Sequence, residues 1–120
     1  MKLDQHHENG VTIIAVNGRI DTGEDTARLL QTFICLPSEQ VKKVVLDLSK
    51  LLMVSAAGLN TLSHCYGHIV THGGRLAFVG QPGDVLPLIR RLGLRGNVPH
   101  YGSNADAIAV LSALDYRGAV

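Results

Sequence analysis

Two apolar patterns alternate along this chain, and their alternation constrains the fold more than any other feature. Apolar runs rich in β-branched residues at positions 11–16, 41–48 and 76–79 predict strands. Between these runs, apolar residues recur every three or four positions, which predicts amphipathic helices. Strands that alternate with helices form a mainly parallel sheet, because a helix carries the chain back between parallel neighbours. The sequence therefore predicts an α/β fold.

Local signals mark where the predicted helices begin and end. Thr22 is a predicted N-cap, with Asp25 three residues further on in the positive first turn. A second helix begins near Ala57 and stops at the glycine pair 73–74. Pro82 and Gly93 mark the start and end of the third helix. Ser103 is the predicted N-cap of the fourth helix, which we expect to run through about residue 114.

A polar segment at residues 2–7 precedes the first apolar strand, and the Asn-Gly pair at 9–10 between them is a strong hairpin signal. Because this segment is polar, we expect it at an edge of the sheet. A short strand at 97–101 completes the order β-β-α-β-α-β-α-β-α, with about five strands and about four helices. We find no linker and no internal repeat, so we expect one domain over residues 1–120.

Charge and composition exclude some classes of partner. The 120 residues carry a formal net charge of +1, and only 4% are aromatic. A nucleic-acid interface needs a clustered basic face and aromatic residues for stacking, so we expect none. The N-terminus lacks the apolar core of a signal peptide, and no apolar run approaches the roughly 20 residues that span a bilayer. A cytoplasmic location without membrane insertion is the default expectation.

The sequence shows no catalytic or cofactor motif. It has neither the glycine-rich loops that hold dinucleotides or nucleotide phosphates nor the turn that presents a nucleophilic serine. The carboxylates are scattered, and none forms an acid–base pair along the sequence. We therefore expect no enzyme activity, no catalytic residue and no cofactor.

Histidines and cysteines are the remaining candidates for chemistry. His64, His68 and His72 lie four residues apart, a spacing that can place two imidazoles on one face of a helix to hold a metal ion. No carboxylate or ligand from a second element accompanies them, so we expect a solvated polar stripe and no metal site. Cys35 and Cys65 do not form a CxxC pair, and we expect both to be buried, reduced thiols.

The segment at residues 44–62 holds the best candidate for a binding surface. A buried strand ends near Asp47, a short apolar stretch at 51–54 crosses to a turn of small residues, and a helix begins there. Small side chains let another surface approach closely, and the free amides of a first helical turn favour an anion. Packing of the small residues against the sheet is the alternative, and the pattern leaves both open. The residues of this turn are Ser55, Ala56, Ala57, Gly58 and Leu59.

The same segment resembles the signature of the STAS domain, a family shared by sulphate transporters and anti-sigma factor antagonists. That signature runs approximately D-L-S-x-[apolar]-x-[apolar]-[apolar]-D-S-[ST]-G-[apolar]. Residues 16–22, with the loop Gly-Arg-Ile-Asp, and residues 73–80 resemble two further family motifs. The resemblance covers about residues 10–114 and implies a STAS fold. The signature positions that match are Asp47, Leu48, Ser49, Val54, Gly58 and Leu59.

The resemblance also implies a phosphorylation switch, which this chain has altered. In anti-sigma factor antagonists, the partner kinase phosphorylates a serine that follows the second aspartate of the signature. A phosphoserine there adds about −1.5 to −2 charges, which would expel the partner. Here Ser55 stands at the aspartate position, and Ala56 at the phosphoacceptor position has no hydroxyl. Three explanations remain open: a natural constitutive binder, an engineered serine-to-alanine form, or phosphorylation of Ser55.

The sequence thus predicts a bacterial STAS regulator of transcription that binds a kinase-type anti-sigma factor or a similar switch partner. By resemblance, Asp21 and Thr22 would flank the partner's surface near its nucleotide. The alternative is a constitutive accessory STAS subunit of a membrane transporter or lipid-transport complex, which needs no phosphoserine. The expected partner-binding residues are Asp21, Thr22, Ser55, Ala56, Ala57, Gly58 and Leu59.

Overall fold

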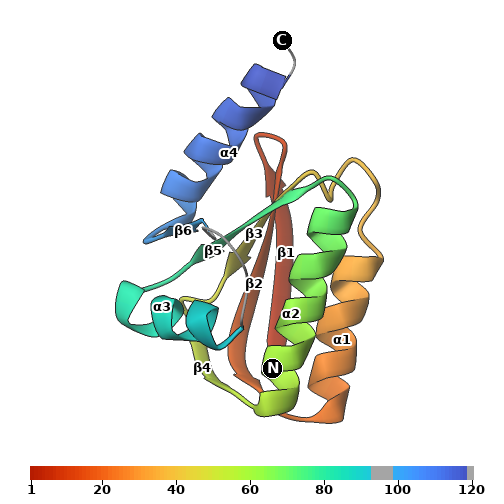
Figure 1. Cartoon of the computed structure of the whole chain (residues 1–120), viewed down its shortest axis with the longest axis vertical. Helices are drawn as coiled ribbons and strands as arrows, with labels where there is room; N and C mark the ends of the chain where they lie inside the picture. The colour runs from red at the N-terminus through yellow and green to blue at the C-terminus, as the bar shows by residue number, and fades with distance from the viewer. Residues whose placement is uncertain (93–98, 119–120) are drawn as a thin grey trace.

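A mixed sheet with helices on both faces organises the computed structural model, which describes residues 1–92 and 99–118 (Figure 1). The strand order is β1-β2-β3-β5-β6, and β4 pairs with β2 off this path. β1 is antiparallel to β2, and all other described pairs are parallel. The predicted α/β class is confirmed. The elements are β1 (Lys2–Glu8), β2 (Val11–Ile20), α1 (Gly23–Ile34), β3 (Lys43–Asp47), β4 (Leu51–Val54), α2 (Ala56–Thr71), β5 (Arg75–Val79), α3 (Pro82–Arg91), β6 (His100–Tyr101) and α4 (Asn104–Gly118).

Each face of the sheet has its own apolar core. On one face, α1, α2 and α3 bury side chains such as Phe33, Ile69 and Leu88 in the larger cluster. On the other face, Ile108 and Leu111 of α4 pack in a smaller cluster. The middle strands are therefore covered on both sides, which explains their continuous apolar runs.

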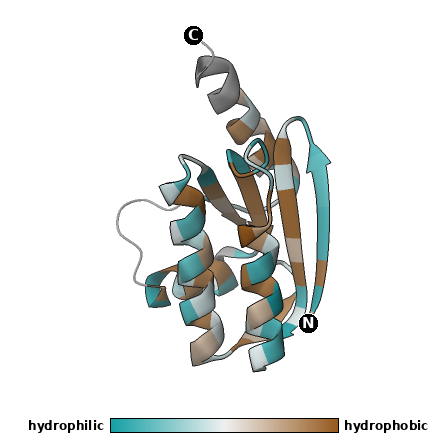
Figure 2. Cartoon of the chain, turned by 90° about the vertical axis from the view of Figure 1, so that its right-hand side faces the viewer, coloured by the Kyte–Doolittle hydropathy of each residue, from teal (hydrophilic) through white to brown (hydrophobic). Residues whose placement is uncertain are grey.

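The first two strands form the predicted hairpin. Asn9 and Gly10 have φ angles of 53° and 78°, the left-handed values that a two-residue turn of this kind requires. β1 lies at the sheet edge, as expected from its polarity, and Figure 2 shows it in hydrophilic colours beside the apolar β2.

The second half of β2 and the whole of β4 differ from the prediction. The strand predicted at 11–16 continues to Ile20, through residues that the sequence indicated as a turn and loop. It continues because β4 pairs with this half, with Gly18 opposite Leu51 and Arg19 opposite Met53. The register shift between these two pairs leaves one extra residue of β4 in a β-bulge.

The helix boundaries mostly follow their predicted signals. Thr22 is the N-cap of α1, and Pro82 lies in the first turn of α3. α4 extends to Gly118, beyond the predicted end. The predicted helix stop at Gly93 and the start of the predicted strand at 97–98 lie outside the described residues. Of the helices that the structure describes, none has the length and apolar character needed to cross a membrane.

Candidate functional site

The starts of α1 and α2 lie side by side, because β2 and β4 run parallel and end together. Ile20 and Val54 are register partners at these two strand ends. The N–H of Ser55 donates to the carbonyl oxygen of Ile20 at 2.9 Å. This hydrogen bond joins the end of β2 to the residue that follows β4. Both groups of residues that the sequence singled out therefore meet at one end of the molecule (Figure 1). We call residues 55–59 together with Asp21 and Thr22 the helix-start surface.

Ser55 is the N-cap of α2. Its hydroxyl oxygen accepts a hydrogen bond from the N–H of Gly58 at 3.0 Å, and its carbonyl oxygen accepts one from the N–H of Leu59 at 2.9 Å. Serine at a helix N-cap satisfies an amide that has no partner inside the helix. The half-buried Ser55 side chain thus has a structural role at the position where the family signature has an aspartate.

The small residues of the turn divide into two kinds. Ala56 and Ala57 are exposed at the start of α2, so their small side chains are not needed for packing beneath the helix. Gly58 is buried, and a Cβ there would lie 2.7 Å from Cγ2 of Val54 and 2.9 Å from Cγ2 of Ile20. The packing explanation therefore holds for Gly58, and the accessible-surface explanation holds for the two alanines.

Leu59 has one side on the core and one side in solvent. It is half-buried and packs against the larger apolar cluster. Its remaining exposure lies next to the alanines of the first turn. The helix-start surface therefore offers small and apolar groups over a rigid, packed base.

The start of α1 is closed by a capping box. The hydroxyl oxygen of Thr22 accepts from the N–H of Asp25 at 3.1 Å. In return, Oδ2 of Asp25 accepts from the N–H groups of Thr22 at 3.2 Å and Asp21 at 3.3 Å. The bond from the Thr22 backbone is the main reason why the pKa of Asp25 lies below its ordinary value. These bonds fix the backbone of Asp21 and Thr22, whose side chains are exposed beside α2.

Asp47, the first signature aspartate, has a structural role away from this surface. Its Oδ1 accepts from the N–H of Ser49 at 3.0 Å, and its Oδ2 accepts from Nδ2 of Asn104 at 3.0 Å. The carboxylate thereby links the end of β3 to the first residue of α4. No local sequence signal marks Asn104, because its partner Asp47 lies far away in the chain.

The histidine stripe is polar and partly exposed, as predicted. The rings of His68 and His72 lie 4.3 Å apart, and Nδ1 of His72 lies 2.8 Å from the carbonyl oxygen of His68. Partial burial, with a smaller effect from the charge of His72, lowers the pKa of His68. Within residues 1–92 and 99–118, no three potential ligand side chains gather closely enough to hold a metal ion.

The two cysteines differ from each other. Cys65 is buried on the inner face of α2, and burial raises the pKa of its thiol to about 12. Cys35 is exposed, so its predicted burial is wrong. It is the C-cap of α1, one residue beyond the last helical turn, and its side chain lies outside the apolar stripe of that helix.

The sequence matches the family model of the STAS domain over residues 2–107. The chain belongs to the STAS domain family. This membership agrees with the sheet order and with the helix start that follows β4. No curated protein matches the sequence.

Solved structures of anti-sigma factor antagonists have the same fold. An anti-sigma factor antagonist from Mycobacterium paratuberculosis superposes with a TM-score of 0.71 at 26% identity, over 92% of each chain. The unphosphorylated form of the anti-sigma factor antagonist SpoIIAA gives 0.63 at 9% identity, over 99% of this chain and 100% of its own. A STAS protein from Planctomyces limnophilus gives 0.66 at 15% identity, over 91% of this chain and 96% of its own. At these low identities, the similarity to the last two structures shows a shared fold and nothing further.

Beside the helix-start surface lies a groove that the sequence pattern did not predict. It runs between β4 and α3 and has a volume of about 440 Å³. The stretch 51–54 appeared in the sequence only as a short apolar connection. Its pairing with β2, which creates one wall of this groove, depends on contacts distant in sequence.

Proposed function

We propose that this STAS domain is an anti-sigma factor antagonist-like regulator that binds a kinase-type anti-sigma factor, or a similar switch protein, through the helix-start surface. It acts by binding in the cytoplasm and catalyses no reaction. The similarity to the Mycobacterium paratuberculosis antagonist supports the functional class. The observation that carries the proposal is the pair of exposed alanines at the start of α2, beside Asp21 and Thr22.

The physical case rests on what this surface lacks. No acidic residue lies in the first turn of α2, so the positive end of the helix dipole is not neutralised by the chain itself. Ala56 and Ala57 present no bulky or charged group, so a partner can approach the backbone closely. A phosphate at this point would occupy that approach and bring charge into the interface. Ala56 therefore keeps the surface in its binding-competent form.

Binding to a purified kinase-type anti-sigma factor encoded by the same genome tests the proposal. We expect Ala57→Asp to weaken binding at least tenfold, because it places a charge inside the interface. Ala105→Asp is a matched control, since Ala105 is the exposed second residue of α4. Equal binding by wild type and Ala57→Asp would refute the proposed surface.

A second experiment addresses the switch and the three explanations for Ala56. The variant Ala56→Ser is incubated with the same kinase and ATP, and phosphate incorporation is located by mass spectrometry. We expect phosphate on the new serine of the variant and none on wild type. Phosphate on Ser55 of wild type would instead identify this residue as the acceptor.

The constitutive accessory subunit is the second candidate function, and the missing hydroxyl at Ala56 favours it. Such a subunit would bind no anti-sigma factor, and Ala56→Ser would stay unphosphorylated. It would instead copurify with a membrane transporter or a lipid-transport complex from detergent extracts. That combination of results would replace the proposed function.

A further inference from the structure

Leu52 is the most exposed of the large apolar side chains in the described part of the chain. It is 80% exposed, whereas Ile34 is 52% exposed and Val110 is 40% exposed. Leu52 is the extra residue of the bulge, because Gly18 pairs with Leu51 and Arg19 pairs with Met53. A β-bulge redirects a side chain and interrupts the ladder at that point. The backbone geometry of β4 therefore holds this leucine out in solvent.

The exposed leucine borders the β4–α3 groove. All four residues of β4 line this groove on one side, and Pro87, Leu88 and Arg91 of α3 are among those on the other. Val54, the last of the β4 residues, directly precedes the Ser55 cap. The groove and the helix-start surface are thus parts of one continuous surface.

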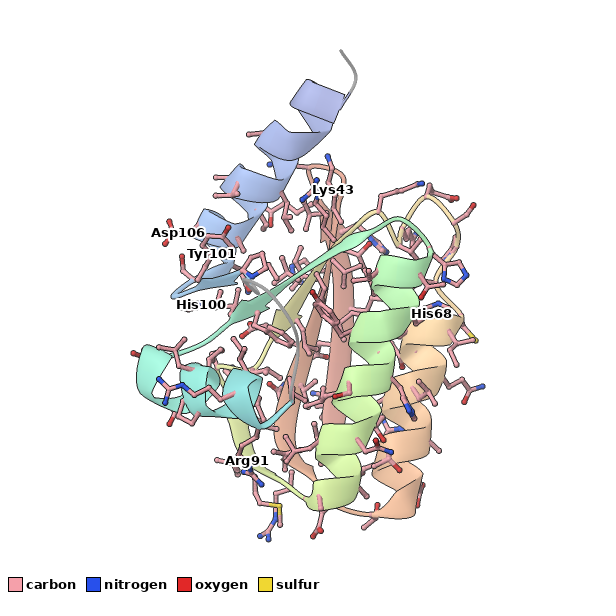
Figure 3. All side chains as sticks on the ribbon, in the orientation of Figure 1. Lys43, His68, Arg91, His100, Tyr101 and Asp106 are labelled. Carbon is pink, nitrogen blue, oxygen red and sulfur yellow. The ribbon has the colours of Figure 1, made fainter. Side chains whose placement is uncertain are left out.

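One exposed basic residue lines the groove, and two more lie in the backbone next to β4. Arg91 lines the groove, and Figure 3 shows it beside the lower end of β4. Arg19 is the register partner of Met53, and Lys50 directly precedes β4. In residues 1–92 and 99–118, none of these three cations has an ion pair. Asp84, at the other end of α3, is the single acidic residue lining the groove.

We propose that the β4–α3 groove binds an apolar side chain flanked by carboxylates, supplied by the same protein partner that covers the helix-start surface. This inference rests on the proposed function and adds the second half of the interface. Leu52 and the apolar groove wall bury an apolar group, and Arg91 at the groove pairs with an acidic neighbour. Arg19 and Lys50, beside β4 in the backbone, add positive charge near this end of the sheet. Complementary charges of this kind increase the association rate and select the partner.

Two other occupants fit the surface less well. An added β-strand needs a regular edge, and the bulge at Leu52 disrupts the edge of β4. A second copy of this chain that paired through the same surface would bring the exposed cations of both copies into one interface, in which each groove supplies a single acidic residue, because a two-fold interface uses one patch on both subunits. An acidic partner avoids both difficulties.

The test compares Leu52→Ser and Arg91→Glu with wild type, in binding to the purified kinase-type anti-sigma factor at two salt concentrations. We expect each variant to lower affinity at least tenfold, which corresponds to about 1.4 kcal/mol. The loss for Arg91→Glu should shrink at high salt, because salt screens exposed charges. Ile34→Ser and Arg90→Glu are matched controls on other exposed positions, and both should bind like wild type.

The outcomes separate this inference from the proposed function. If wild type binds and Ala57→Asp does not, but Leu52→Ser binds normally, the groove is outside the interface and only this inference fails. If wild type does not bind the anti-sigma factor at all, both fail. If Leu52→Ser converts a wild-type dimer into a monomer in light scattering, a second copy occupies the groove and the inference is wrong.

Discussion

Two helices begin side by side at one end of this protein, and they begin differently. Both have a hydroxyl N-cap, Thr22 for α1 and Ser55 for α2. In α1, Glu24 and Asp25 follow in the first turn, and Asp25 completes a capping box with Thr22. In α2 the first turn has no acidic residue. The first helix start is satisfied within the chain, whereas the second remains open to an external group.

This difference indicates how a small domain can combine a rigid frame with a helix start that is free for the proposed binding. Carboxylates near a helix N-terminus stabilise the helix by roughly 0.3–1 kcal/mol each at exposed positions. α2 lacks this contribution and depends on its cap and on close packing around Gly58. Four predictions test this contrast, and they follow in order of decreasing effect on stability.

The largest effect is expected at Gly58. We expect Gly58→Ala to lower the free energy of unfolding by about 1–3 kcal/mol, because its Cβ would overlap Val54 and Ile20. The control is Gly67→Ala in the same helix, where an added Cβ meets nothing within 4 Å. That variant should gain about 0.5–1 kcal/mol. Urea unfolding measures both, and similar changes in the two variants would show that α2 does not depend on close packing.

The two caps should be of similar strength. We expect Ser55→Ala and Thr22→Ala each to cost about 1 kcal/mol, because each leaves one amide of the first turn without its partner. Thermal unfolding of both variants checks this. Ser55→Asp, which restores a capping oxygen, should recover the loss. A negligible effect of Ser55→Ala would mean that the cap does not hold α2.

Supplying α2 with the carboxylate it lacks should separate stability from binding. We expect Ala56→Glu to stabilise the fold by about 0.3–1 kcal/mol through the helix dipole, and to weaken partner binding. Ala56→Gln, with the same shape and no charge, is the control for both measurements. If Ala56→Glu is more stable than wild type and binds the partner as tightly, the first turn of α2 is not part of the interface.

The smallest effect concerns acid stability. The pKa of Asp25 is lowered from 3.8, mainly by its bond from the Thr22 backbone. A carboxylate with a lowered pKa stabilises the fold above its unfolded pKa, and this stability is lost as pH falls through the folded value. We expect Asp25→Asn to flatten the decline of stability below pH 4, measured by urea unfolding from pH 5 to 2. An Asp25→Asn variant that loses stability below pH 4 as steeply as wild type would contradict this role of the carboxylate.

The parts of this fold that could be predicted from the sequence are those with a local signal. The hairpin at 9–10, the cap at Thr22 and the helix stripes each depend on neighbouring residues, and the structure has all of them. β4 and the end of β2 were missed together, because each is a strand only through pairing with the other. The Asn-Gly pair at 17–18 also carries a turn signal, which the parallel pairing overrides.

The sequence places the candidate site at residues 55–59, but it does not predict which of these residues are exposed and which are buried. The sequence shows three small residues in a row and does not show which of them faces the core. Which of the three is buried depends on how closely α2 packs against Ile20 of β2, a residue distant in the sequence. The exposure of Leu52 follows from the bulge for the same reason.

The division between Gly58 and the alanines has a consequence for how such a domain could change over time. Close packing around the buried Gly58 holds the helix, so the exposed side chains of Ala56 and Ala57 contribute little to folding. Alanine and serine codons differ by one base, and at position 56 either side chain would point into solvent. A lineage could therefore gain or lose the phosphorylatable hydroxyl in a single mutational step, without a compensating change elsewhere in the domain.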